Sequence, residues 1–267
     1  MASKFLYTIT TGRSGTVYLT NLLKQNLLNA TVYHERTGYQ SFGVHTPDAS
    51  HFTLFNSVGN VEQVQRFWQQ KHERDRLTVN DWYIETSHFL AKAGLMENLE
   101  ILKPHATNIH IIILRRDVYK TLWSYVNRFD FFNSGFTWLF TLDHRYPKVI
   151  VKSASFAKHG MFGIALWYII EMRCRAEYYK QVFAKDSMVH FHDIQLENII
   201  EKPGAISFLS ELAGTKYTDC LLPEKVNQTK NVCFGDKERE FCQNLVGRFK
   251  FNASEMTTKY IKAGGRL

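Results

Sequence analysis

The residues of this sequence best suited to binding a charged group stand directly after its first apolar run. Gly12, Arg13, Ser14 and Gly15 follow the apolar residues 5–9, and leucines at helical spacing come next. A glycine-bearing turn between a strand and a helix directs several backbone N–H groups at one point, where the positive end of the helix dipole also lies. The glycines permit close approach of a ligand, and Arg13 adds a positive charge. This pattern predicts an anion-binding turn.

Two other interpretations of this turn are weaker. In an ordinary strand-to-helix turn Ser14 would cap the helix, which explains the serine but neither Arg13 nor the two glycines. A Walker A loop has four residues between its glycines and a lysine after the second one. Here Gly15 follows Gly12 too soon, and Thr16 stands where the lysine should be. The missing lysine disfavours an ATP-dependent kinase.

A second group of candidate anion ligands follows the apolar run 109–114. Arg115 and Arg116 end this run, and Ser124 stands eight positions after Arg116, two turns into an expected helix. An arginine at the carboxyl end of a parallel strand faces the ligand side of the sheet. The alternative is an arginine paired with Asp117 and a solvated serine. Two such groups in one chain favour a shared ligand.

Elements that can position these residues alternate along the chain between apolar runs and helical patterns. The runs predicted to be strands are 5–9, 31–33, 82–86, 109–114 and 188–191. Longer helical patterns cover 118–132 and 162–183, and Pro203 suits the first turn of a further helix. Such alternation predicts a three-layer α/β fold, with a mainly parallel central sheet between helices, formed by residues 1–267 as a single domain.

Composition excludes several classes of protein. With 45% hydrophobic and 14% aromatic residues the chain can form a core, so a disordered chain is excluded. The longest mostly apolar stretch, 160–170, is shorter than the roughly 18–20 residues that span a bilayer. The four cysteines show no paired metal-ligand spacing, and the first residues lack the long apolar region of a signal peptide. We therefore expect no membrane span and a cytoplasmic location.

The charge balance suggests an anionic partner. Subtracting 25 acidic from 33 basic residues leaves a formal charge of +8. Nucleic acid is one candidate, yet the basic residues are dispersed and form no recognisable nucleic-acid-binding motif. We therefore expect no nucleic-acid partner.

The segment Gly12-Arg13-Ser14-Gly15-Thr16 resembles the 5′-phosphosulfate loop of sulfotransferases that use 3′-phosphoadenosine 5′-phosphosulfate (PAPS). In these enzymes a Lys/Arg-Ser-Gly-Thr turn follows the first strand. The resemblance implies that Arg13, Ser14, Gly15, Thr16 and the next residue, Val17, hold the 5′-phosphosulfate. Many members have a hydroxyl residue where this chain has Val17.

A second resemblance covers the 3′-phosphate element of the same family, in which an arginine ends an apolar strand and a serine follows eight positions later. Arg116 and Ser124 match this spacing, and Arg115 misses it by one and stays a reserve candidate. Val118 departs from the proline or small residue that is frequent there. Residues 191–214 are similar to a third family segment, so the resemblance runs from about residue 5 to 214.

These resemblances imply a P-loop NTPase-like sulfotransferase fold and transfer of a sulfuryl group from PAPS to a hydroxyl or amine. The co-substrate would leave as adenosine 3′,5′-bisphosphate, and no metal would be required. A late segment containing Lys225 and Lys230 resembles the family loop that closes over the nucleotide. Either lysine is a candidate phosphate ligand there, although a solvated loop lysine is the more common case.

Three residues are candidates for accepting the proton of the acceptor. Glu35 follows the strand 31–33, and a glutamate at a similar distance after the loop is the proposed base of the tyrosylprotein sulfotransferases. His88 resembles the histidine of a Lys-Thr-His element in cytosolic members, with the spacing changed by one residue. Glu85 is an alternative that can instead orient substrate or pair with an arginine. An ion pair of Glu35 with Arg13 or Arg36 is the structural alternative.

The acceptor itself has no signature. The segments 36–80 and 128–160 correspond to the variable, acceptor-binding regions of the family, and nothing in them distinguishes a small molecule from a glycan or a lipid. Aromatic residues in 129–146 fit a hydrophobic core better than a substrate cleft. Two other functions stay open, a nucleotide-dependent kinase with a degenerate P-loop and a non-catalytic module that binds a polyanion or nucleic acid.

Overall fold

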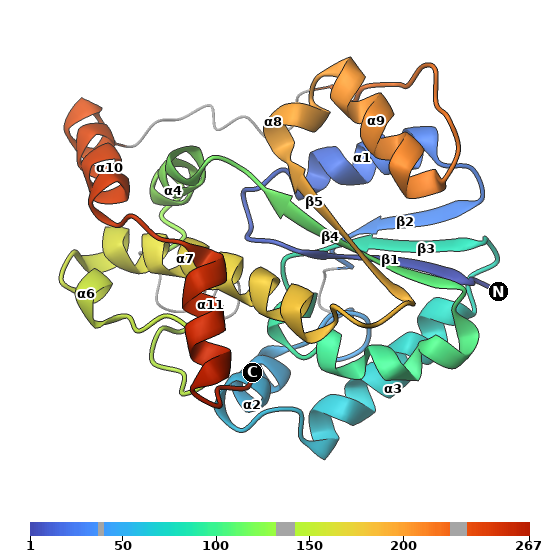
Figure 1. The fold of residues 1–267 in the computed structure, drawn as a ribbon, viewed down its shortest axis with the longest axis horizontal. Helices are drawn as coiled ribbons and strands as arrows, with labels where there is room; N and C mark the ends of the chain where they lie inside the picture. Colours follow the sequence, from blue (N-terminus) through green and yellow to red (C-terminus); the bar gives the residue numbers. More distant parts are fainter. Residues whose placement is uncertain (37–39, 132–141, 225–233) are drawn as a thin grey trace.

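A five-stranded, all-parallel sheet forms the centre of the molecule (Figure 1). The computed structural model describes residues 1–36, 40–131, 142–224 and 234–267. The strands are β1 (Lys4–Ile9), β2 (Ala30–His34), β3 (Trp82–Thr86), β4 (Asn108–Arg115) and β5 (Val189–Gln195). They lie in the order β2-β3-β1-β4-β5. The predicted α/β class with a parallel sheet is confirmed.

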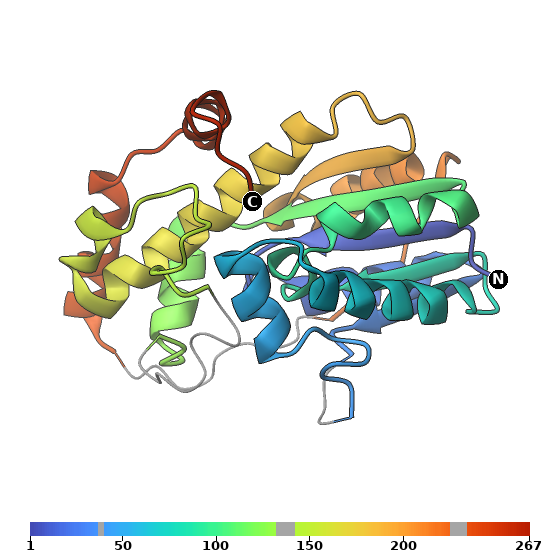
Figure 2. The same cartoon turned by 90° about the horizontal axis from the view of Figure 1, so that it is seen from below.

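Helices cover both faces of this sheet. One face carries α1 (Thr16–Asn26), α8 (Leu196–Ile199) and α9 (Lys202–Ala213), as Figure 1 shows. On the other face lie α3 (Glu62–Arg76) and the long α7 (Gly160–Val182), which stand in front of the strands in Figure 2. The remaining elements are α2 (Ala49–Ser57), η1 (Leu90–Lys92), η2 (Met96–Ile101), η3 (Lys103–His105), α4 (Val118–Val126), α6 (Ala154–Ala157), α10 (Asp236–Arg248) and α11 (Ala253–Lys262).

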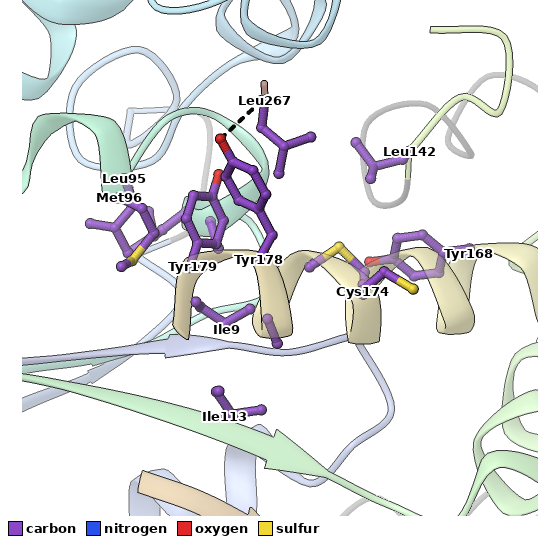
Figure 3. Close-up of a cluster of buried hydrophobic side chains, with 14 of the residues drawn as sticks. Ile9, Leu95, Met96, Ile113, Leu142, Tyr168, Cys174, Tyr178, Tyr179 and Leu267 are labelled. Carbon is purple, nitrogen blue, oxygen red and sulfur yellow. Dashed lines mark hydrogen bonds between the residues drawn. The ribbon is translucent and has the colours of Figure 1, made fainter. Parts of the chain in front are cut away.

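The three inner strands are buried because both of their faces are covered. Their apolar residues belong alternately to the two hydrophobic clusters on either side of the sheet. Figure 3 shows Ile9 of β1 and Ile113 of β4 beneath α7, and Tyr178 of α7 beside the chain terminus. The Leu267 N–H donates to the Tyr178 hydroxyl at 3.5 Å. The last residue is thus anchored to the helix that covers the sheet.

Two elements differ in length from their sequence prediction. The helix predicted for 118–132 ends at Val126, because the backbone turns at Asn127 and Phe129 adopts a left-handed φ of 57°. The strand predicted for 188–191 starts at Val189 and extends to Gln195, and its last four residues alternate between buried and exposed positions, as expected at a sheet edge. The helix predicted to start at Pro203 is α9, with this proline in its first turn.

All five strands end at one edge of the sheet because they are parallel. Ile9, His34, Thr86 and Arg115 are the last residues of β1, β2, β3 and β4. The residues singled out by the sequence follow these ends directly. Among the described helices, none is both long enough and apolar enough to cross a membrane.

Candidate functional site

The turn between β1 and α1 has a backbone that only a few residues can adopt. Gly15 has a φ of 96°, and a Cβ atom there would lie 2.6 Å from a methyl group of Leu196, the first residue of α8. Arg13 also has a positive φ, 63°. The turn is fixed to the neighbouring strand, since the Thr10 hydroxyl donates to the Leu114 carbonyl at 2.8 Å. Gly15 is thus required for the turn to pack against α8.

The backbone N–H groups of this turn are available to a ligand. Within the described residues, the N–H groups of Gly12, Arg13, Ser14 and Gly15 donate no hydrogen bond. Gly15 is the N-cap of α1, and no side chain caps this helix. Free N–H groups at the amino end of a helix are a favourable site for an anion.

The hydroxyl groups of the turn lie in different places. Ser14 is buried, donates to the Thr11 carbonyl at 2.7 Å and lies 2.6 Å from the Thr11 hydroxyl. It therefore stabilises the turn and does not cap α1, which contradicts the capping interpretation. Thr16 is buried in the first turn of α1, and Val17 beside it is half-buried.

The structure brings the two predicted phosphate elements together. Arg13 Nε donates to the Ser124 hydroxyl at 2.9 Å, across a separation of 111 residues. Arg116 Nη1 donates to the Arg13 carbonyl at 3.0 Å. Burial and then the charge of Arg128 lower the pKa of Arg13. In the described part of the chain neither Arg13 nor Arg116 forms an ion pair with a carboxylate, so both charges can serve an anionic ligand.

Arg115 is in a different situation. Its Nη2 lies 2.6 Å from a carboxylate oxygen of Glu177 and 2.7 Å from one of Asp193. Two acidic side chains therefore already neutralise this arginine. Of the two neighbouring arginines, Arg116 contacts the turn and Arg115 joins β4 to α7 and β5.

A groove of about 370 Å³ lies beside Arg116, at the start of α4. Asp117, Arg173 and Glu197 are among the residues that line it. Two carboxylates in its wall oppose the binding of a second anion. The turn with Arg13 is the more favourable anion site.

Glu35 and His88 meet beside the same turn. Glu35 directly follows β2, and its N–H donates to the Thr86 carbonyl of β3 at 3.1 Å. Its Oε1 lies 3.5 Å from His88 Nε2 and 3.4 Å from the His88 backbone nitrogen. A Cβ atom at Gly12 would lie 3.6 Å from His88 Nε2. The two candidate bases are thus adjacent to each other and to the anion-binding turn.

Burial changes the acidity of Glu35. Its side chain is 16% exposed, and the loss of water around the carboxylate raises its pKa to about 7. The Lys92 charge and the His88 backbone N–H act in the opposite direction but do not cancel this effect. A carboxylate with a pKa near neutrality can accept a proton and release it again at physiological pH.

Glu85 lies inside the core, where its side chain is fully buried. One of its oxygens lies 2.6 Å from Lys71 Nζ on α3 and accepts from the Tyr83 hydroxyl at 2.7 Å. Lys71 also pairs with Asp75. Glu85 therefore pairs with a lysine of the α3 face, not with the arginine expected as its alternative partner.

Sequence reasoning missed the residues behind His88. Lys92 is fully buried, and its Nζ lies 3.1 Å from His88 Nδ1. Tyr125 is buried with its hydroxyl 3.0 Å from the Cβ position of Gly12. The signal for Lys92 was a single lysine inside the apolar run 89–93, where a charge requires a specific reason.

Several candidates cannot be placed. Lys225 and Lys230 lie outside the described residues, as do Phe132, Phe136, Trp138 and Phe140 of the aromatic segment. In the described ranges no three His, Cys, Asp or Glu side chains are arranged to hold a metal ion.

Comparisons with known proteins give no family for this chain. No protein-family model matches it, and no curated protein has a matching sequence.

Proposed function

We propose that this protein transfers a sulfuryl group from PAPS to a hydroxyl or amine of an acceptor. The observation that carries this proposal is the junction of two predicted phosphate elements at one turn, through Arg13, Ser124 and Arg116. PAPS bears one phosphate-containing group at each end of its ribose, so it needs two anion sites close together. The sequence predicts both sites, and the contacts of Arg13 with Ser124 and Arg116 support their use by one ligand.

The turn fits the phosphosulfate end of this co-substrate. The N–H groups of residues 12–15 and the side chain of Arg13 are the donors for its oxygens. Arg116 and Ser124 are the donors for the 3′-phosphate. Fixed donors of this kind stabilise negative charge that develops on a leaving phosphate. Bound at this turn, PAPS supplies an activated sulfuryl group.

One member of the Glu35–His88 pair takes the acceptor's proton. The reaction breaks the sulfur–oxygen bond to the 5′-phosphate and forms one to the acceptor, so the acceptor must lose a proton at the same place. Glu35 and His88 lie next to Gly12 of the turn, and the raised pKa of Glu35 suits a base. The further assignment of PAPS rather than another nucleotide with two anionic groups is supported by the spacing of Arg116 and Ser124.

A transfer assay with ³⁵S-labelled PAPS tests this function directly. The protein is incubated with labelled PAPS and pooled acceptors, namely phenols, sterols, short glycans and tyrosine peptides, and labelled products are separated. We expect a labelled product with one pool. Glu35→Gln should bind nucleotide like the wild type but lose turnover by roughly 10²–10⁴-fold, the range for a general base.

Two outcomes would contradict the proposal. Transfer of ³²P from ATP to an acceptor would indicate a kinase instead. Binding of a polyanion such as heparin without any binding of PAPS would indicate a module without this chemistry.

A further inference from the structure

The structure shows a chain of three polar side chains leading inward from the proposed site. His88 follows β3, and Lys92 is the last residue of η1, one helical turn further on. Glu35 Oε1 lies 3.5 Å from His88 Nε2, and His88 Nδ1 lies 3.1 Å from Lys92 Nζ. Both nitrogens of the imidazole are therefore occupied, one by a carboxylate and the other by an amine.

Lys92 is enclosed by aromatic rings and a hydroxyl. Its Nζ lies 5.4 to 5.8 Å from the ring centres of Phe52, Phe89 and Tyr168. It also donates to the Tyr168 hydroxyl at 3.3 Å. Aromatic faces attract an ammonium group. Burial acts against this charge and lowers the pKa of Lys92, while the nearby Glu35 raises it. The ammonium form, which the aromatic rings and Glu35 favour, has donors only, whereas a neutral amine also has a lone pair that can accept from Nδ1–H.

A donor at Nδ1 determines where the proton of a neutral imidazole is. If Nδ1 accepts from Lys92, the proton must be on Nε2. Nε2 then donates towards Glu35 and has no lone pair with which to take a proton from an acceptor. The carboxylate of Glu35 keeps free lone pairs and can take it.

We propose that Lys92 is a positioning residue that holds His88 in the tautomer protonated at Nε2, which leaves Glu35 as the base of the reaction. The first half of this proposal concerns the free protein. The second half rests on the proposed sulfuryl transfer. The two halves can be tested separately.

Nitrogen NMR of the histidine side chains in the free protein tests the tautomer. Protein labelled with ¹⁵N in its imidazoles is recorded above pH 7.5, and the His88 signals are identified by their loss in His88→Gln. We expect a protonated Nε2 and an unprotonated Nδ1. A wild-type His88 protonated at Nδ1 would overturn the proposal, and this result needs no variant of Lys92 and no activity.

Lys92→Met tests the cause of this tautomer. Methionine fills a similar volume without a donor, so His88 should shift towards the tautomer protonated at Nδ1. Lys71→Met is the matched control, because Lys71 is equally buried but pairs with Glu85 and Asp75. It should leave the His88 signals unchanged. An unchanged tautomer in a folded Lys92→Met protein would contradict the proposal.

The second half of the proposal is tested by the transfer rates of two variants, His88→Gln and Glu35→Gln. The amide of His88→Gln can still donate an N–H towards Glu35, so its transfer rate should fall by no more than about tenfold. Glu35→Gln should lose roughly 10²–10⁴-fold. The reverse order would show that His88 is the base. If the wild type transfers no sulfuryl group to any acceptor, the proposed function fails while the NMR result on the tautomer stands.

Discussion

At the scale of single residues, the contrast between two neighbouring arginines carries most information. Arg115 is neutralised by Glu177 and Asp193, whereas Arg116 contacts the backbone of the β1–α1 turn and has no carboxylate partner among the described residues. An arginine without a counter-ion at a turn rich in N–H groups is suited to an external anion. The spacing from Ser124 favours Arg116, but the sequence alone could not predict the ion pairs of Arg115, whose partners lie 60 or more positions away.

Arg116→Ala should therefore weaken the binding of adenosine 3′,5′-bisphosphate. The lost hydrogen bonds to a charged group correspond to roughly 10–100-fold in the dissociation constant. Isothermal titration calorimetry measures this constant for the wild type and the variant. Arg115→Ala is the control and should bind like the wild type. If only Arg115→Ala bound the bisphosphate more weakly, Arg115 and not Arg116 would bind the 3′-phosphate.

Glu35 predicts the pH dependence of turnover. The group must be ionised to accept a proton, and burial raises its pKa to about 7. The rate should therefore rise with pH up to about 7 and level off above it, as measured in initial-rate assays at saturating co-substrate. A rate that falls as pH rises through 7 would show that a protonated group is needed instead.

Glu97 predicts a pH dependence of stability that is independent of function. Its half-buried side chain accepts from the Tyr179 hydroxyl at 2.9 Å, and the loss of water around the carboxylate raises its pKa to about 7. The protonated Glu97 side chain is favoured in the folded protein, because its folded pKa exceeds the unfolded value. Its contribution to the free energy of unfolding is therefore complete below about pH 4.5 and is lost as pH rises through 7. The loss amounts to about 3 kcal/mol.

Glu97→Gln removes this loss and keeps an acceptor for Tyr179. Its melting temperature should exceed that of the wild type at pH 8 and match it near pH 5 in thermal denaturation. Glu240→Gln changes an exposed residue of α10 and serves as control. If the difference in melting temperature between Glu97→Gln and the wild type were the same at both pH values, Glu97 would not have the raised pKa.

At the scale of elements, the β1–α1 turn depends on its contact with α8. The sequence predicts the turn and its glycines, but it does not show that Leu196 closes against Gly15. The same holds for Glu35 and His88, which meet because β2 pairs with β3. The order of strands in a sheet is set by long-range packing, so local patterns could not predict this contact.

Gly15→Ala should destabilise the protein by about 1–3 kcal/mol, because the left-handed backbone is strained and the new methyl group collides with Leu196. Urea denaturation followed by circular dichroism measures the loss. Gly247→Ala is the matched control, since Gly247 lies in α10 with open space around its Cβ position. That change should stabilise by roughly 0.5–1 kcal/mol. Equal changes in the free energy of unfolding for the two variants would show that the backbone of the turn does not require glycine.

At the scale of the whole molecule, the sequence predicts the layers better than the element ends. All five predicted strands are present, because short apolar runs alternate with helical patterns along the chain, and β4 is a continuous apolar run, as expected of a strand covered on both faces. The end of α4 at Val126 was not predictable from apolar spacing, since Phe129 and Phe131 continue the helical pattern. Lys92 was missed because several of its partners lie far away in the sequence, in α2 and α7, and join those from the segment after β3.

The net charge of +8 now has a partial explanation. Arg13 and Arg116, which form no ion pair with a carboxylate of the described ranges, place two positive charges at the carboxyl edge of the sheet, where the proposed nucleotide binds. They account for a minor part of the excess. The remaining charge can draw an anionic co-substrate towards the site at low ionic strength.

Nucleotide selectivity tests the central claim most directly, because it does not require the acceptor to be known. Calorimetric titration compares adenosine 3′,5′-bisphosphate with ADP and with magnesium ATP, which lack a 3′-phosphate. We expect the bisphosphate to bind with a micromolar or lower dissociation constant. ADP and magnesium ATP should bind at least about tenfold more weakly, because one charged contact is missing. Equal or tighter binding of magnesium ATP, or no binding of the bisphosphate, would contradict the central claim.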